Sequence, residues 1–295
     1  MKPMKLTQML RKILAKLLIH KYSLIYMLIL LGFTANANPP LASKQQIGMF
    51  KNSKTCIVLD NSNISYNLFL TDAIKKYWKN TEFEFIDQLE FEKRRFNSNF
   101  SFLVLMKGVF DKDPSGISYN YMSLVLGDAA RDVTNMPEIC SIPISYSDEP
   151  TSDNGYAFPA IIQFMQKHAT NLEKKRFIIS MLGLKYYNHK IGFNNKVLLL
   201  NKDKVAANAD SPGKIATVYP YYIKLLTVAE IEAEIATNPV NLVFNFHVGP
   251  TTVSGSGKCF EMIFDVEGNL YYYNYRKITN DNPDGFNLKD FKHIK

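Results

Sequence analysis

The stretch Lys54-Thr-Cys-Ile-Val-Leu-Asp60 decides the fold, because the chain contains a second version of it. That version is Lys196-Val-Leu-Leu-Leu-Asn201, and the likeness continues, so that residues 54–127 return as residues 196–268 at a shift of 140 to 142. Three pairs of glycines keep a shift of 141: Gly108 and Gly249, Gly116 and Gly257, Gly127 and Gly268. The sequence therefore predicts one structural unit used twice.

Both units predict the same order of elements. Short apolar runs that end in turn-forming residues indicate buried strands, and apolar residues at helical spacing indicate helices between them. Asp87 with Glu90, and Thr227 with Glu230, match the capping box that opens a helix. Strands are expected at 56–59, 83–86, 100–106, 119–126 and 139–146, and at 197–200, 221–226, 241–248, 259–265 and 270–275. The prediction is an α/β fold of two tandem βαβαβββ units with mixed sheets.

Between the units lies a predicted helical bridge. Pro159 suits the first turn of a helix, and apolar residues from Ile161 to Leu172 then recur on one face. We expect the bridge to join two repeats that pack on each other as a pseudo-dimer. The predicted organisation is a signal peptide at 1–37, a lead-in segment at 38–52, the first repeat at 53–150, the bridge at 151–190 and the second repeat at 191–295.

Residues 1–37 have the pattern of a secretory signal. They contain six basic residues and no acidic one, followed by the apolar run Leu24–Phe33 and the small residues Ala35 and Ala37. This order predicts cleavage after Ala37, and the alternative is an uncleaved N-terminal anchor. The apolar run is short for a membrane span of about 20 residues. We therefore expect an exported protein, periplasmic, outer-membrane-associated or secreted, with no stable membrane insertion after cleavage.

The net charge of +8 belongs largely to this signal. Removing its six basic residues leaves 35 − 6 = 29 basic against 27 acidic residues, a net charge of +2. Nucleic-acid binding normally needs a clustered basic face, so no nucleic-acid partner is expected. The short basic runs Lys93–Arg95 and Lys174–Arg176 are interpreted as solvated helix faces.

The three cysteines, Cys56, Cys140 and Cys259, leave at least one thiol unpaired in an exported protein. Cys56 lies in an apolar strand pattern and is expected to be buried. Buried free thiols are favoured for all three, because nothing in the chain resembles a small disulfide scaffold. A Cys140–Cys259 disulfide is the alternative.

Asp60, Asn201 and His247 are the weak candidates for a site in a cleft between the repeats. Asp60 and Asn201 end equivalent strands, where ligands bind in many parallel sheets. The alternative is that both side chains hold turn amides. His247 ends the third strand of the second unit, where the first unit has Met106, and the alternative is a packed, hydrogen-bonded histidine.

No catalytic residue, cofactor site or metal site is predicted. The chain contains no G-x-S-x-G nucleophile turn, H-E-x-x-H or C-x-x-C motif. The Gly-rich sequence Ser254-Gly-Ser-Gly-Lys258 lacks the Walker pattern and lies between two predicted strands, so a hairpin loop is expected there.

Several short motifs resemble those of exported, two-repeat α/β proteins of Bacteroidota: Lys196-Val-Leu-Leu-Leu-Asn201, Tyr219-Pro-Tyr221, Gly257-Lys-Cys-Phe260, Gly268-Asn-Leu-Tyr-Tyr-Tyr273 and Met136-Pro-Glu138. The resemblance spans nearly the whole chain after the signal. It implies no activity and no site residues.

The sequence favours a non-enzymatic cell-envelope protein that acts as a partner-binding or assembly module. Its partner is expected to be an envelope protein or a small ligand. Two alternatives come from other classes: an envelope hydrolase and a small-ligand-binding protein, each with its site in the cleft between the repeats.

Overall fold

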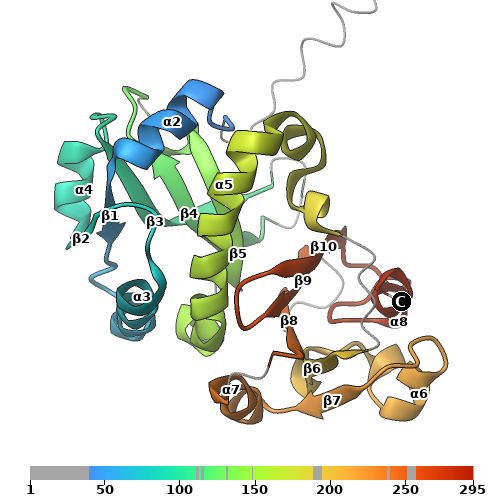
Figure 1. Ribbon diagram of the computed structural model, residues 1–295. Helices are drawn as coiled ribbons and strands as arrows, with labels where there is room; N and C mark the ends of the chain where they lie inside the picture. The colour runs from blue at the N-terminus through green and yellow to red at the C-terminus, as the bar shows by residue number, and fades with distance from the viewer. Residues whose placement is uncertain are drawn as a thin grey trace, which may run out of the picture. The chain divides into compact units, whose positions relative to one another are not determined.

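The structure, a computed structural model, describes residues 40–110, 113, 116–130, 132–147, 149–188, 195–237, 240–250 and 257–294. These ranges hold two five-stranded sheets and seven α-helices, α2 to α8 (Figure 1). No helix within them is long and apolar enough to cross a membrane. The predicted signal peptide, and residues 254–256 of the predicted Gly-rich loop, lie outside the described residues.

The first sheet has the strand order β2-β1-β3-β4-β5. Its elements are β1 (Lys54–Val58), α3 (Ile64–Tyr77), β2 (Phe83–Ile86), α4 (Gln88–Arg94), β3 (Phe100–Val109), β4 (Ser118–Leu126) and β5 (Glu138–Tyr146). β1 runs parallel to β2 and to β3, whereas β3, β4 and β5 are antiparallel. Two crossovers followed by a meander are the predicted topology of the repeat.

The second sheet repeats this arrangement with the order β10-β9-β8-β6-β7, in which β6 takes the place of β1. Its elements are β6 (Val197–Asn201), α6 (Pro212–Ala216), β7 (Ile223–Leu226), α7 (Val228–Ala236), β8 (Leu242–Val248), β9 (Lys258–Asp265), β10 (Leu270–Lys277) and α8 (Leu288–His293). The parallel and antiparallel pairings match those of the first sheet. The predicted two-repeat α/β fold is confirmed.

The predicted capping boxes differ between the repeats. In α7, Thr227 accepts from the amide of Glu230, and the Glu230 carboxylate accepts the amide of Thr227 in return, 2.8 Å away. In α4, Asp87 accepts from the amide of Glu90, but the Glu90 carboxylate binds Arg94 at 2.6 Å instead. A cation one turn further along the helix competes for the carboxylate, so only half of the predicted box forms there.

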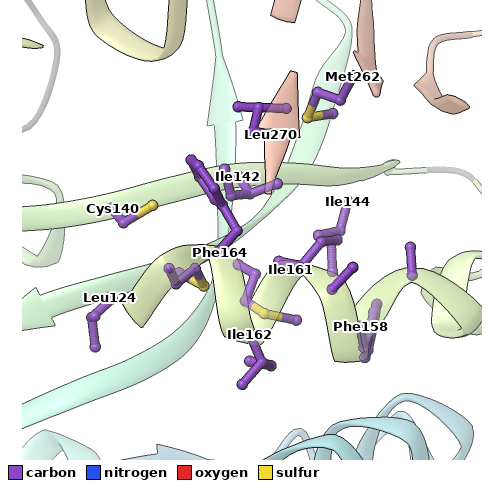
Figure 2. Packing of buried hydrophobic residues seen from close by; sticks show 14 of the residues in the cluster. Leu124, Cys140, Ile142, Ile144, Phe158, Ile161, Ile162, Phe164, Met262 and Leu270 are labelled. Carbon is purple, nitrogen blue, oxygen red and sulfur yellow. The ribbon is translucent and has the colours of Figure 1, made fainter. Parts of the chain in front are cut away.

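α5 (Phe158–Leu182) is the predicted bridge, and it lies within the core that the repeats share. Figure 2 shows Ile161 and Phe164 of α5 together with Ile142 of the first sheet and Met262 and Leu270 of the second. The apolar face expected from the sequence is buried along its whole length. Both repeats therefore depend on one helix for part of their hydrophobic stabilisation.

Direct contacts also join the two repeats. Tyr119 of β4 is fully buried, and its hydroxyl donates to the carbonyl oxygen of Lys258 and accepts from the amide of the same residue. Its ring packs edge-on against Phe260 at 5.3 Å. The Lys258 ammonium lies 3.4 Å from the centre of the Phe110 ring, a cation–π contact. Aromatic side chains thus fill the space between these strands.

The meander edge of each sheet carries extra hydrogen bonds. Along β5, the amide of Ala42 donates to the Glu138 carbonyl, and the amide of Glu138 donates to the Pro40 carbonyl, each at 2.8 Å. Along β10, the Asn188 side chain donates to the carbonyl of Tyr273 and accepts from its amide. A short backbone segment covers part of one edge, and a single side-chain amide covers part of the other.

The predicted lead-in segment contains a helix that the sequence pattern did not reveal, α2 (Lys44–Asn52). Ser43 and Gln46 form its capping box, and Ile47 and Phe50 are buried. Only these two side chains of α2 are fully buried, with Met49 partly buried beside them, so the segment looks polar in sequence. α2 packs against α5, beside which it lies in Figure 1.

Candidate functional site

Asp60 and Asn201 both hold turns at the ends of equivalent strands. Asp60 Oδ1 accepts from the amide of Ser62 at 2.9 Å, and Asn201 Oδ1 accepts from the amide of Asp203 at 3.0 Å. This is the turn-forming interpretation of the repeated polar position. Each side-chain oxygen is bonded to an amide two residues further along its own chain.

His247 lies on β8 with its side chain buried among acidic groups. Its Nδ1 is 2.7 Å from Glu261 Oε1, and its Nε2 is 3.2 Å from Asp284 Oδ1. These contacts involve neither Asp60 nor Asn201. Among the described residues the three predicted site residues share no hydrogen-bond or ion-pair partner, so the structure does not bring them together as one site.

The contacts of His247 belong to a larger buried ionic cluster. Glu261 is fully buried, accepts from the Asn245 side-chain amide at 3.0 Å and lies 3.6 Å from the Arg276 guanidinium. Arg276 also pairs with Asp290 at 3.0 Å and donates to the carbonyl of Gly285. We call His247, Glu261, Arg276, Asp284 and Asp290 the ionic cluster. It ties β8, β9 and β10 to the C-terminal segment.

Gly249 makes room for the ionic cluster. A Cβ atom at this position would collide with Asp284 Oδ1 and would come within 2.8 Å of His247 Nε2. Its partner in the first repeat, Gly108, faces only the ring of Tyr121. The glycine at this repeated position therefore leaves room for the ionic cluster in the second repeat and for the Tyr121 ring in the first.

Electrostatics keep a proton on His247. Burial opposes the charged form, but the neighbouring carboxylates of Glu261 and Asp284 raise the pKa of His247 to about 10. Burial also disfavours the ionised form of Asp284, yet the imidazolium lowers the pKa of that carboxyl below its usual range. A histidine that stays protonated at neutral pH cannot act as a general base there.

The raised pKa predicts a pH dependence of stability. A histidine whose pKa rises from 6.5 to about 10 on folding stabilises the protein fully below pH 6.5, and this contribution is lost as the pH rises towards 10. Urea unfolding across this range should show a falling free energy of unfolding. In a His247→Met variant the slope should be shallower, because the imidazole no longer titrates. An unchanged slope would contradict the assignment.

The first repeat has no equivalent of the ionic pair. His247 faces Glu261 across β8 and β9, and the matching positions of β3 and β4 are Met106 and Tyr121. Asp265, the last residue of β9, accepts the amides of Glu267 and Asn269 in the β9–β10 turn. Counting residues across the β8–β9 hairpin could have found Glu261, but the position of Asp284 depends on a loop.

All three cysteines are free and buried, as expected. Burial is the largest influence on each, and it raises the pKa of Cys56 to about 11. The pKa values of Cys140 and Cys259 are also raised by burial. The thiolate is the reactive form of cysteine, so these thiols are poor nucleophiles at neutral pH.

An apolar stripe faces solvent at the C-terminal end of α5. The helix departs from helical geometry at Lys175, where φ is −127° and ψ is 24°. Beyond this kink the residues one turn apart form two exposed pairs, Phe177 with Met181 and Ile178 with Leu182. Their exposed fractions are 76%, 70%, 42% and 51%, in that order. We call these four residues the α5 stripe.

The surroundings of the α5 stripe are basic. The sequence from Lys174 to Lys185 contains four basic residues and no acidic one, and Lys174, Lys175 and Lys185 are exposed. Arg176 donates to the carbonyl oxygens of Leu41 and Ala42. The described part of the chain therefore begins next to the stripe.

Two hollows at the surface are lined by residues other than Asp60, Asn201 and His247. One, of ≈ 310 Å³, lies beside β10 and α8, where Tyr272 and His293 are among the lining residues. The hydroxyl of Tyr272 is already bonded to Asp290. The other, of ≈ 440 Å³, lies between α2 and the β4 end and includes Met49 and Phe96. Within the described ranges no group of three or more His, Cys, Asp or Glu residues is placed to hold a metal ion.

Comparison of the chain with protein-family models, with curated proteins and with solved structures gives no match.

Proposed function

We propose that this protein is a non-enzymatic component of the cell envelope that binds a partner, or assembles with one, through the α5 stripe. The stripe is the observation that carries the proposal. Its four apolar side chains face solvent at helical spacing, whereas Ile179 on the opposite side is buried. Soluble proteins rarely expose contiguous apolar patches unless the patch binds something.

The charges around the stripe specify the chemistry of the partner. Lys174 and Lys175 precede the stripe and Lys185 follows it. The Lys185 ammonium lies over the ring of Tyr275, so a partner that covers the stripe meets its apolar side chains and, at its start, the exposed Lys174 and Lys175. Its surface must be apolar where it is buried and negatively charged at its margin. The signal-like sequence of residues 1–37 supports a location in the envelope.

The ionic cluster supports a role other than catalysis. Its histidine is protonated at neutral pH, and its Glu261 is fully buried and bonded to Asn245 and His247. These contacts join three strands to the segment that carries Asp284 and Asp290. A cluster of this kind stabilises one arrangement of the second repeat.

The proposal is tested by the location of the protein in the cells that make it. The chain from Asn38 onward is placed behind a signal peptide of known cleavage, so that residues 1–37 play no part. We expect the wild-type chain to sediment with envelope membranes and a Phe177→Ser/Met181→Ser variant to move to the soluble fraction. The matched control is Ile64→Ser/Leu68→Ser on α3, an equally exposed pair. The proposal would be contradicted if the stripe variant stayed with the envelope membranes. It would also be contradicted if the control variant moved to the soluble fraction as much as the stripe variant does.

A further inference from the structure

We propose that the occupant of the α5 stripe is the surface of an anionic lipid bilayer, on which the kinked end of α5 lies flat. This inference rests on the proposed function and names its partner. Three observations carry it: the shape of the stripe, the charge around it and the place where the chain enters the described part of the structure.

The stripe has the design of an interfacial helix. Phe177 and Met181 are exposed over 76% and 70% of their surfaces, and Ile178 and Leu182 extend the same face. Ile179 anchors the opposite side in the core. Helices that lie in the plane of a membrane interface present aromatic and aliphatic side chains to the acyl chains and basic side chains to the headgroups. The segment from Lys174 to Leu182 has exposed lysines at its start, Lys174 and Lys175, and the exposed apolar side chains of the stripe after them.

The charge distribution selects lipid carrying a net negative charge. No acidic residue occurs between Lys174 and Lys185. Glu173, the nearest acidic residue before the stripe, is already paired with Lys51 at 2.6 Å. A lysine close to an anionic bilayer contributes about 1 kcal/mol of attraction, which is about a fivefold change in binding. An apolar stripe without these lysines would gain little from anionic headgroups.

The same end of the molecule leads to the most basic and apolar part of the sequence. Arg176, one residue before Phe177, holds Leu41 and Ala42 by their carbonyl oxygens. Residues 1–37, which precede them, contain six basic residues and the apolar run Leu24–Phe33. Arg176, which directly precedes the stripe, is therefore in contact with the residues that follow this signal-like sequence in the chain. The exposed α3 pair, Ile64 and Leu68, lacks both features, because the first turn of α3 has no basic residue.

The test is co-flotation of the purified chain from Asn38 to Lys295 with vesicles. This chain contains the whole compact unit Pro39–Lys295. One vesicle set is phosphatidylcholine alone, and the other contains phosphatidylglycerol as well. We expect binding to the anionic set only, and a loss of binding as salt is raised.

Two variants separate the apolar and the charged contributions. Phe177→Ser/Met181→Ser should lower binding by about tenfold, because two apolar side chains no longer enter the interface. Lys174→Gln/Lys175→Gln should lower binding by about fivefold for each lysine, at low salt only. Ile64→Ser/Leu68→Ser should bind like the wild type. Circular dichroism and thermal unfolding check that each variant is folded.

Specific outcomes overturn the inference. Equal binding to both vesicle sets, or no effect of the stripe and lysine substitutions, would show that lipid is not the occupant. A wild-type dimer in solution that the stripe substitutions dissociate would assign the surface to a second copy. A third outcome is that the stripe variant is released from the envelope in cells while the wild-type chain binds neither vesicle set. The proposed function then stands, and the partner of the stripe is a protein.

Discussion

Replacing His247 by Met is expected to lower the free energy of unfolding by about 3 to 5 kcal/mol at neutral pH. Met is the residue at the equivalent position of the first repeat, Met106, so β8 can accommodate its shape. The substitution leaves the carboxylate of Glu261 fully buried without the imidazolium 2.7 Å away. It also removes the partner of Asp284. Urea unfolding followed by circular dichroism measures the loss.

A second substitution shows whether charge is the cause. In His247→Met/Glu261→Gln the buried carboxylate is replaced by a neutral amide, so the double variant should lose about 1 to 3 kcal/mol less than the sum of the single losses. The matched control is His168→Met, because His168 is also buried but its Nδ1 lies 2.9 Å from the hydroxyl of Tyr187 and not from a carboxylate. Burial lowers the pKa of His168 to about 4, so it is neutral. A control loss as large as that of His247→Met would refute the electrostatic explanation.

Phe164→Ala is expected to destabilise the protein by about 3 to 5 kcal/mol, because it removes a large buried ring and leaves a cavity. The ring lies 5.7 Å from Phe264 of the second sheet and 5.0 Å from Tyr187, which follows α5. It is part of the core that also holds Ile142 of the first sheet, as Figure 2 shows. The cavity therefore opens where both repeats meet the bridge.

The matched control for Phe164 lies on the same helix. Phe177→Ala removes the same ring from an exposed position and should change stability by less than about 0.5 kcal/mol. Both variants are measured by thermal and urea unfolding. We expect Phe164→Ala to shift a single cooperative transition, because the two sheets share one core. A second transition with only one sheet unfolding would disprove this coupling.

The repeat and its strands could be predicted because their signals are local. Runs such as Ile57–Leu59 and Leu198–Leu200 are apolar, short and followed by turn formers, which is typical of buried strands. α2 escaped prediction because only Ile47 and Phe50 of its nine residues are fully buried. The capping box at Asp87 formed only in part, because Arg94 takes the Glu90 carboxylate. Each difference comes from a contact that periodicity alone does not encode.

The candidate sites were less predictable, for a related reason. His247 was recognised as unusual, yet Glu261 and Asp284 are 14 and 37 residues further along the chain. Their approach depends on strand register and on the path of a loop. The exposure of the α5 stripe could not be predicted for a different reason. Phe177 and Met181 have helical spacing, and apolar residues at such spacing normally indicate a buried face. The buried face of α5 continues across the kink at Lys175, because Ile179 follows Leu172 by seven residues and is buried. Phe177 and Met181 lie off that face, and their spacing alone does not show this.

The covered edges of β5 and β10 affect how copies of this protein meet. An uncovered edge strand can pair with a strand of another molecule and lead to aggregation. On one edge the backbone of Pro40 and Ala42 forms hydrogen bonds with the backbone of Glu138. On the other, the side chain of Asn188 forms hydrogen bonds with the backbone of Tyr273. The opposite edges, β2 and β7, are only four residues long. These contacts protect the start of β5 from pairing with another molecule, and trimming the chain past Ala42 would free the backbone groups of Glu138 for such pairing.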